Sequence, residues 1–494
     1  MTDADSPAFP RTPIAPGLAV DPVITGLWQV ADLEKDGRTL DPDLAGAELA
    51  DYARDGFATF DMADHYGSAE IIAGRARRIL LAEGRPAPVI CTKWCPAPAE
   101  MDEATVRAGV ETALRRLDVG RIDLMQFHWW RYEDPRYLDA LRWLARMVEE
   151  GLIGALGVTN FDAAHLHLVC AEGIPVATNQ VSFSLLDRRA AGALSQVCDR
   201  HGVRLLAYGT LCGGFLSERW LDRPEPEAVA DWSKMKYRRF IDAAGGWPVF
   251  QGILRAAAGV ARRHGVSIAN VATRWVLDHP AVAAVIVGAR LGESEHRADN
   301  RRILSLTLDQ DDRAALDAAL AAARPIPGDC GDEYRRPPFL TASGDLSHHL
   351  DSLPPVYPAS AMPARPARMR TETGSVWEAA AGFSRAVRVG DRILVSGTTA
   401  TDHHGNPVCP DDVEGQATFI LDKIAAAIEA VGGRIEDVVR TRIYLTDIAR
   451  WEEASRAHAR VFANVRPANT LVAIGGLVGP YGIEIEAEAV ADQS

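Results

Sequence analysis

Between about residues 25 and 290, short apolar runs alternate with longer stretches in which apolar residues recur every three or four positions. The short runs, rich in Val, Ile and Leu, predict strands. The longer stretches predict helices, because that spacing places apolar side chains on one helical face. Val106, Val110, Leu114 and Leu117 form one such set. The predicted strands are TGLWQV, FATFDMAD, VICTKW, IDLMQFHW, IGALGVTN, VATNQVSF, VRLLAYGT and AVIVGA.

Continuous apolar strands joined by helices indicate a parallel sheet that is covered on both faces. Eight such strand–helix units are what a closed (β/α)8 barrel requires. An open doubly wound sheet is the alternative, and it would be expected to carry a glycine-rich phosphate turn after its first strand. The stretch LWQVADLEKDG has no G-x-G-x-x-G. The pattern therefore favours an α/β fold of the TIM-barrel type for the N-terminal region.

The repeat stops after about residue 325, where ARPIPGDCGDEYRRPPFLTASGDLSHHL is interpreted as a tail that folds over the barrel. We predict a first domain over residues 1–353, a Pro-rich extended linker over 354–372, and a second domain over 373–494. In the second domain, VRVGDRILVSG predicts a hairpin because two apolar runs flank Gly-Asp. A long helix, a strand, a helix and two strands follow, so the order ββαβαββ predicts a small α+β domain.

Composition narrows the class of protein. A chain of 494 residues is long enough for two domains, and 47% apolar with 24% charged residues is ordinary for a soluble protein. The net charge of −14 comes without a stripe of Lys and Arg, so nucleic acid is not an expected partner. Seven scattered cysteines without a Cys-x-x-Cys pair favour reduced thiols, and we place no metal site. With no signal peptide and no membrane-length apolar run, a cytoplasmic location is predicted.

Polar residues follow the predicted strands at the points where each apolar run ends. Because all strands of such a barrel run the same way, these side chains should converge on the carboxyl-terminal rim, where barrel enzymes carry out their chemistry. In order along the chain they are Asp61, Lys93, His128, Thr159 with Asn160, Gln180 and Tyr208. No single one of them is informative, and their joint placement is the signal.

The combination of Asp61, Tyr66, Lys93 and His128 suits the protonation of an oxygen. An ammonium group within about 4 to 6 Å can lower a tyrosine pKa from about 10 by one to three units, and Lys93 would act so on Tyr66. Asp61 would hold Lys93, and His128 would bind the oxygen of a bound carbonyl group. Acid–base help of this kind is worth about 10² to 10⁴ in rate, so the attacking species must itself be reactive. A nicotinamide hydride meets that need.

The motifs DMADHYGSAE, TKW, LMQFHW, GVTNF, NQVSFS, LLAYGTLCGG and VIVGARLGESEHRADN together resemble those of the aldo-keto reductase superfamily over about residues 20 to 320. The resemblance implies a TIM barrel without a Rossmann motif and an extended NADPH across the rim, with NADH as the alternative. The tetrad it implies is Asp61, Tyr66, Lys93 and His128. The cofactor residues it implies are Thr159, Asn160 and Gln180 for the carboxamide, Tyr208 for the ring, Leu211 and Gly213 for the pyrophosphate, and Gly288 to Asn300 for the adenosine half.

Two details of that implied site stay open. Either Arg290 or His296 would face a 2′-phosphate, because the segment between Gly288 and Asn300 is longer than the usual spacing. Trp28 and Trp129 are expected to line the pocket of a small carbonyl substrate. Trp130 is a further candidate for that pocket. Since neighbours on a strand face opposite sides, the alternative is that one of Trp129 and Trp130 points into the interface between barrel and helices.

The second domain resembles the RidA (YjgF-like) family, which has a chorismate-mutase-like fold, through GFSRAVRVGDRILVSG, EDVVRTRIYLTD and YGIEIEAEAV. Asn469 stands where the family's substrate-gripping arginine would be, and Phe383 where it has a tyrosine, so the usual imine hydrolysis is not expected. Glu484 either matches a water-positioning glutamate or belongs to a solvated strand face. The resemblance implies a homo-oligomer, a trimer through this domain.

The function predicted from sequence is an NADPH-dependent reductase that converts an aldehyde or ketone to an alcohol, with the second domain serving oligomerisation or ligand binding. Two alternatives stay open. One is a bifunctional protein whose second domain hydrolyses a reactive imine or enamine. The other is a non-catalytic regulatory subunit that senses the cofactor.

Overall fold

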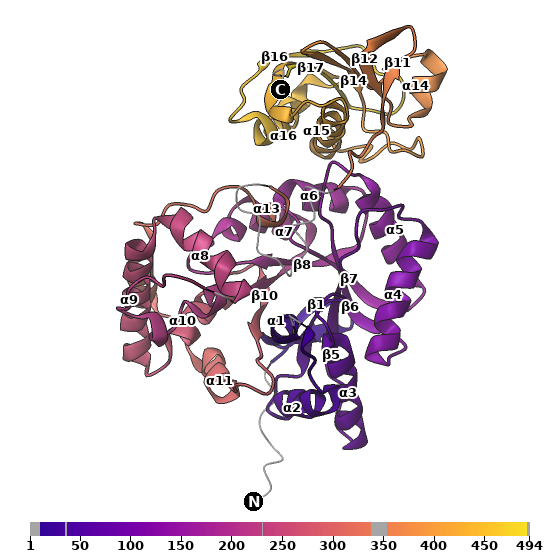
Figure 1. The fold of residues 1–494 in the computed structure, drawn as a ribbon. Helices are drawn as coiled ribbons and strands as arrows, with labels where there is room; N and C mark the ends of the chain where they lie inside the picture. The colour runs from indigo at the N-terminus through magenta and orange to yellow at the C-terminus, as the bar shows by residue number, and fades with distance from the viewer. Residues whose placement is uncertain (1–9, 35–36, 230, 337–352, 492–494) are drawn as a thin grey trace, which may run out of the picture. The chain divides into compact units, whose positions relative to one another are not determined.

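The computed structural model describes residues 10–34, 37–229, 231–336 and 353–491 (Figure 1). The chain divides into two compact units, an N-terminal one and a C-terminal one. The first contains a closed barrel, and the second a seven-stranded sheet. None of the helices described combines the length and the apolar character needed to cross a lipid bilayer.

Eight parallel strands close the barrel, which confirms the predicted TIM-barrel fold. In chain order they are β3 (Val23–Gly26), β4 (Thr59–Asp61), β5 (Val89–Trp94), β6 (Ile122–His128), β7 (Ile153–Thr159), β8 (Val176–Ser182), β9 (Arg204–Tyr208) and β10 (Val282–Gly288). Two strands are shorter than predicted: FATFDMAD contains only β4, and the strand expected at TGLWQV ends at Gly26. A Cβ atom at that position would lie 2.7 Å from the Ile286 side chain, and helix α1 (Trp28–Glu34) begins two residues later.

Helices follow the strands and surround the barrel (Figure 1). Helix α4 (Glu103–Leu117) contains the predicted apolar set, burying Val106 and Val110, and Asp102 caps its first turn by accepting from the Thr105 amide. The others are α2 (Pro42–Arg54), α3 (Ala69–Ala82), α5 (Arg136–Glu149), α6 (Ala163–Ala171), α7 (Ala193–His201), α8 (Trp232–Ala244), α9 (Trp247–His264), α10 (Ile268–Leu277), α11 (Arg297–Ser305), α12 (Gln310–Leu320) and α13 (Asp332–Arg335).

A short hairpin precedes the barrel and was not expected from the sequence. Strands β1 (Thr12–Ala15) and β2 (Leu18–Val20) pair antiparallel. Their buried residues Ile14, Leu18 and Val20 belong to one apolar cluster with barrel-strand residues such as Leu124 and Leu206. The hairpin therefore seals the end of the barrel at which the strands begin.

The C-terminal unit is an α+β fold, as predicted. Its strand order is β11-β12-β13-β14-β17-β15-β16, in which only β15 and β16 run parallel. The strands are β11 (Ala359–Met362), β12 (Arg365–Thr371), β13 (Ala386–Val389), β14 (Arg392–Thr398), β15 (Val438–Leu445), β16 (Ala468–Ala473) and β17 (Ile483–Val490). The helices are α14 (Val376–Ala381), α15 (Val413–Ala430) and α16 (Trp451–Phe462).

The predicted linker over residues 354–372 is corrected by two of these strands. β11 and β12 form an antiparallel pair at the edge of the sheet, and β12 also pairs with β13. The prolines that suggested a linker are accommodated, since Pro363 lies in the turn and Pro366 lies where the register of the pair shifts. Sheets tolerate proline at such edges and irregularities.

Candidate active site

The centre of the candidate site is a buried ion pair. The Lys93 Nζ atom lies 2.6 Å from Asp61 Oδ2 and donates a second hydrogen bond, of 2.8 Å, to the Met62 carbonyl. The amide groups of Gln126 and Gln180 donate to Asp61 Oδ1 at 2.9 and 2.7 Å. Asp61 closes β4 and Lys93 lies near the end of β5, so the convergence expected of parallel strands brings these two together.

Tyr66 lies in the loop that follows β4, beside this pair. The Lys93 Nζ atom is 5.1 Å from the centroid of its ring. The ring of Trp28, at the start of α1, meets the Tyr66 ring edge to face at 5.0 Å, and the Trp28 indole donates to Ser233 Oγ at 2.9 Å. The tyrosine is thus held between an ammonium group and the Trp28 ring, and the role of Trp28 in lining a substrate pocket stays a prediction.

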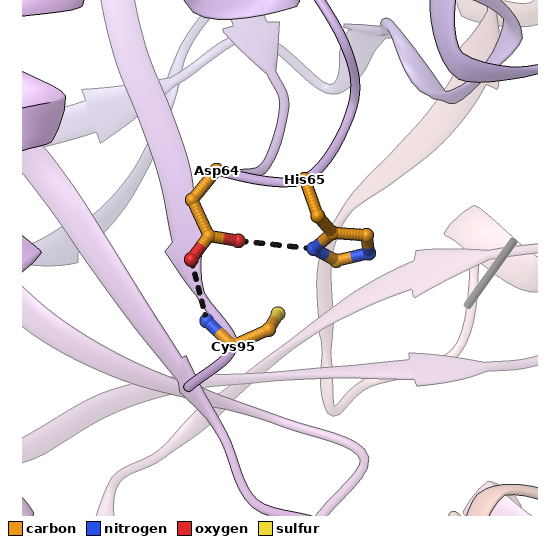
Figure 2. A group of neighbouring side chains, drawn as sticks. All are labelled: Asp64, His65 and Cys95. Atoms are coloured by element: carbon orange, nitrogen blue, oxygen red, sulfur yellow. Dashed lines mark hydrogen bonds and ion pairs between the residues drawn. The ribbon is translucent and has the colours of Figure 1, made fainter. Parts of the chain in front are cut away.

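Figure 2 shows how Asp64 braces the loop that carries Tyr66. One carboxylate oxygen lies 3.0 Å from His65 Nδ1, and the other accepts from the Cys95 backbone amide at 3.1 Å. Asp64, His65 and Cys95 are residue types that can ligate a metal, and their ligand atoms lie within 4.8 Å of one another. Because both Asp64 oxygens already accept hydrogen bonds from the protein, we interpret the trio as a structural brace.

His128 ends β6 and presents one open ring nitrogen. Its Nδ1 lies 3.2 Å from the Thr159 carbonyl oxygen, whereas Nε2 is buried with no hydrogen-bond partner among the described residues. Burial, followed by the charge of Arg335, lowers the pKa of His128 well below its ordinary value, so the ring is neutral near pH 7. Tyr334 approaches its face at 5.6 Å.

The two adjacent tryptophans differ from the predicted assignment. Trp129 is fully buried, and its ring stacks on Phe127 at 5.8 Å. Trp130 instead meets the His128 ring edge to face at 4.2 Å and donates from its indole to the Pro96 carbonyl. Because neighbours along an extended chain face opposite ways, Trp130 is the residue beside the site, and Trp129 belongs to the barrel wall.

The three residues predicted to hold a nicotinamide carboxamide lie at neighbouring strand ends, but their hydrogen bonding differs. The Thr159 Oγ1 atom is buried without a partner among the described residues. Asn160, in a left-handed conformation with φ 58°, accepts from the Tyr208 hydroxyl at 2.8 Å. Gln180 donates to Asp61 and to Gln126. Thr159 is therefore the one with open hydrogen-bonding capacity for a bound group.

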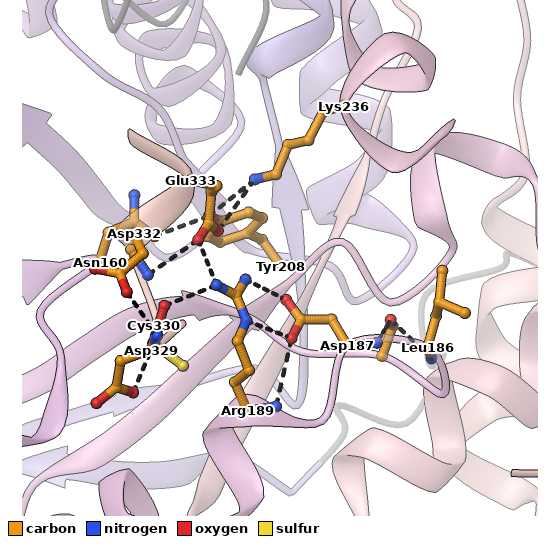
Figure 3. A network of polar contacts seen from close by, with 12 residues as sticks. Asn160, Leu186, Asp187, Arg189, Tyr208, Lys236, Asp329, Cys330, Asp332 and Glu333 are labelled. Atoms are coloured by element: carbon orange, nitrogen blue, oxygen red, sulfur yellow. Dashed lines mark hydrogen bonds and ion pairs between the residues drawn. The ribbon is translucent and has the colours of Figure 1, made fainter. Parts of the chain in front are cut away.

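Sequence reasoning missed a buried polar network next to Tyr208, which Figure 3 shows. Lys236, on α8, donates to the hydroxyls of Tyr208 and Tyr334 at 3.2 and 2.9 Å. Glu333, on α13, pairs with Arg189 at 2.9 Å and lies 3.6 Å from the Lys236 ammonium. The network fixes the predicted tail segment, as far as residue 336, beside the candidate site.

Two acids of this tail have pKa values that are shifted in opposite directions. Burial acts to raise the pKa of Glu333, but the charges of Arg189 and Lys236 outweigh it and lower that pKa to about 2. Burial, together with the nearby charge of Asp162, raises the pKa of Asp329 to about 6. Glu333 is therefore the ionic anchor of the tail, whereas Asp329 loses its proton at a higher pH than an ordinary aspartate.

The residues predicted for the far half of a dinucleotide lie in two rim loops. Gly213 has a positive φ of 65°, and a Cβ atom there would lie about 3 Å from Tyr237 and Ser233, so the turn that begins at Leu211 is packed against α8. Gly288 packs closely against the Gln29 side chain. His296 is exposed immediately before α11, and Asn300 lies in its first turn.

The candidate residues of the C-terminal unit do not form one cluster. Asn469, on β16, donates to Thr441 Oγ1 at 2.9 Å. Glu484, on β17, lies against Gly397, and its neighbour on the same strand face, Glu486, pairs with an arginine. The Phe383 ring lies 5.4 Å from the guanidinium of Arg385, which directly precedes β13. Within residues 353–491, no hydrogen bond or ring contact joins Asn469 to Phe383 or Glu484.

A parallel barrel whose rim holds a buried Asp–Lys pair, a tyrosine and a neutral histidine defines a barrel enzyme of the oxidoreductase class. The sequence profile of the Aldo/keto reductase family matches residues 22–321, and the profile named Endoribonuclease L-PSP matches residues 373–491. The chain belongs to the aldo/keto reductase family, and its C-terminal domain is of the L-PSP/RidA type.

Relatives of known name support both parts. Pyridoxal reductase of Arabidopsis thaliana is 26% identical over 61% of this chain and 84% of that protein. Flagellar radial spoke protein 5 of Chlamydomonas reinhardtii is 32% identical over 32% of this chain, a match that spans only 33% of that protein. A RutC family protein of Saccharolobus solfataricus is 32% identical over 23% of this chain and 87% of that protein. The solved structure of a glycerol dehydrogenase of Gluconobacter oxydans superposes with a TM-score of 0.53 and 26% identity, covering 65% of this chain and 97% of that one.

Proposed function

We propose that the barrel reduces an aldehyde or a ketone to an alcohol with a nicotinamide dinucleotide. The observation that carries the proposal is the buried Asp61–Lys93 pair, whose ammonium lies 5.1 Å from the ring of Tyr66. A positive charge beside a phenol stabilises the phenolate that is left when the proton moves to a carbonyl oxygen. Tyr66 is therefore the proton donor in this proposal.

The other rim residues hold the reacting groups in place. The hydrogen bonds from Gln126 and Gln180 stabilise the ionised form of Asp61, which in turn keeps Lys93 charged and oriented. The open Nε2 atom of His128 would bind the substrate oxygen. Trp28 and Trp130 would flank the substrate.

The dinucleotide, when bound, supplies the hydride that attacks the carbonyl carbon. The unpartnered Thr159 hydroxyl supports this role, since a carboxamide would satisfy it. Asn160 and Gln180 would assist Thr159, and the Tyr208 ring would lie beside the nicotinamide. NADPH is the form expected from sequence, with NADH as the alternative.

The substrate is proposed to be a small carbonyl compound. The names of two relatives support this, because pyridoxal reductase and glycerol dehydrogenase both act on small molecules. The C-terminal domain is proposed to assemble the protein into a homo-oligomer, a trimer. Leu394, Val472 and Val490 are 40% to 45% exposed on the sheet face that also carries Glu484, and such apolar exposure favours an interface. Sedimentation velocity would measure the assembly, and a monomer would contradict it.

The decisive experiment measures oxidation of NADPH and NADH by the purified full chain against sugar, aromatic, pyridoxal-like and keto-acid carbonyls. Tyr66→Phe should lower turnover of the best substrate by about 10² to 10⁴ while cofactor binding is retained. Tyr444→Phe, on the C-terminal sheet, is the matched control and should leave turnover unchanged. Full activity of Tyr66→Phe would contradict the proposed role. Cofactor binding without turnover of any carbonyl would favour the regulatory alternative.

A further inference from the structure

The loop between β10 and α11, residues 289–296, lies on the rim directly after the last barrel strand. In TIM barrels the loops after the last two strands are a frequent site for phosphate groups. If the barrel binds a dinucleotide as proposed above, the adenosine ribose belongs at this loop. The ribose carries a 2′-phosphate in NADPH and a free 2′-hydroxyl in NADH. The charges of the loop therefore bear on which of the two binds, and the inference rests on the proposed function.

Arg290, one of two candidates for a 2′-phosphate ligand, is already surrounded by carboxylates. Its guanidinium lies 2.5 Å from Asp231, 3.2 Å from Glu293 and 3.5 Å from Asp32. Asp231 also pairs with Lys234 at 2.8 Å. These three carboxylates and two cations leave the group with a net charge of −1. Asp32 is only 6% exposed, so its charge is poorly screened by solvent.

The backbone donors of the same loop are occupied by carboxylates as well. The Gly292 amide donates to Glu48, on α2, at 2.6 Å. The Arg297 amide, the first of α11, donates to Glu295, and the Arg297 guanidinium pairs with Glu295 and with Asp55. Free amides at such a loop and helix start would be the natural ligands of a phosphate group. Here acidic side chains of the chain itself take that place.

We propose that this acidic cluster, Asp32, Glu48, Asp231 and Glu293, selects a dinucleotide with a free ribose 2′-hydroxyl, so that NADH binds more tightly than NADPH. A carboxylate accepts a hydrogen bond from a ribose hydroxyl, the arrangement by which dinucleotide sites commonly favour NADH. A 2′-phosphate carries a charge of about −1.5 to −2 and would meet a cluster that is already negative. To bind Arg290 it would have to displace Asp231 and leave Asp32 partly uncompensated.

The test measures affinity directly and needs no substrate. NADH and NADPH are titrated into the purified full chain while the fluorescence of the dinucleotide is followed. The dissociation constant for NADH should be lower than that for NADPH by about tenfold or more, which corresponds to about 1.4 kcal/mol. Tighter binding of NADPH by the wild-type protein would overturn the inference.

Substitutions that remove one carboxylate at a time show which residues set the preference for NADH over NADPH. Asp231→Asn and Asp32→Asn should each tighten NADPH binding several-fold with little change for NADH, so the preference narrows. Asparagine retains the helix-capping ability that Asp231 uses at the start of α8, so folding should be preserved. Glu103→Gln is the matched control, because Glu103 also pairs with an arginine, at 3.0 Å, but lies on α4. An unchanged preference in both aspartate variants would contradict the assignment.

Arg290→Gln separates the two interpretations of the arginine. A phosphate ligand would be lost, and NADPH binding alone would weaken by about tenfold or more, which would overturn the inference. If Arg290 mainly balances the three carboxylates, its removal leaves the cluster more negative, so binding of both dinucleotides should weaken, because both are anions. Failure of the proposed function has a different signature: neither dinucleotide binds, or NADH binds more tightly and yet no carbonyl is reduced. The first result overturns both proposals, whereas the second leaves the cofactor preference supported.

Discussion

The two domains place their candidate residues in contrasting ways. In the barrel, residues from the ends of four strands meet at one carboxylate: Lys93, Gln126 and Gln180 all donate hydrogen bonds to Asp61. In the C-terminal sheet, Asn469 and Glu484 lie on different strands and contact different neighbours. A closed parallel barrel directs every strand end to one rim, whereas an open sheet with mostly antiparallel pairs spreads its side chains over a face. Membership of a family therefore predicts the geometry of a site more reliably for the barrel than for the C-terminal sheet.

The largest expected effect is at the centre of the barrel site. Lys93→Met leaves the buried Asp61 without its cation, and breaking such a pair costs about 3–5 kcal/mol of unfolding free energy. Turnover should fall by about 10² or more, because Tyr66 loses the charge beside it. Denaturant unfolding and steady-state kinetics would measure both. Arg107→Met, on a surface arginine of α4 that pairs with Glu103 and Glu150, should show neither change. A fully stable, active Lys93→Met protein would refute the central role of the pair.

The barrel tail should give the next largest effect, in the pH dependence of stability. The pKa of Asp329 is raised from 3.8 to about 6. Asp329 therefore adds at most about 3 kcal/mol to the unfolding free energy below pH 3.8, and this contribution is lost as the pH rises through 6. The pKa of Glu333 is lowered from 4.5 to about 2, so its contribution is present above pH 4.5 and is lost towards pH 2. Asp329→Asn should flatten the unfolding free energy between pH 4 and 7. An unaltered pH profile would contradict the raised pKa of this partly buried acid.

A smaller effect is expected from the glutamines that support Asp61. Gln180→Leu removes one hydrogen bond to a buried carboxylate, which is worth about 1.5–3 kcal/mol. We expect lower thermal stability and a reduced kcat, with Gln126 still holding Asp61. Gln251→Leu serves as a control, since Gln251 bonds only backbone groups away from the rim. Equal kinetic losses in both variants would mean that Gln180 acts through stability alone.

The smallest effect should come from the C-terminal candidate residue. Asn469→Ala loses one neutral hydrogen bond to Thr441 on a well-exposed strand, so about 1 kcal/mol or less of stability and no carbonyl reductase activity should be lost. The full chain should not accelerate hydrolysis of 2-aminoacrylate-type imines above the uncatalysed rate. Acceleration that Asn469→Ala abolishes would show that the second domain has its own active site, as the barrel does.

Much of the barrel site was predictable because continuous apolar strands mark their own ends, and Asp61, Lys93 and His128 occupy those ends. Trp129 and Trp130, which directly follow β6, show the limit of that reasoning, since adjacent residues of an extended segment face opposite sides and the sequence does not say which faces inward. Lys236 and Glu333 were invisible for another reason. Their pairing depends on how a distant tail folds back, and no local pattern encodes that.

The difference between local patterns and contacts of distant segments also explains where the predicted fold was wrong. Strands β1 and β12 contain prolines, which local rules associate with extended or linking chain, and their pairing with neighbours is a tertiary event. The predicted hairpin of β13 and β14 needed no such information. Gly390, with φ 64°, supplies the left-handed turn that joins those two strands.

The β1–β2 hairpin has a practical consequence for protein engineering. The family profile begins at residue 22, so a truncated protein cut at that boundary would lack Ile14, Leu18 and Val20. The barrel floor would then be open to water and would present the apolar side chains of its strand beginnings, among them Leu124 and Leu206. With the hairpin in place, those side chains are covered, so an expression boundary before residue 12 should give a better-behaved protein than one at residue 22.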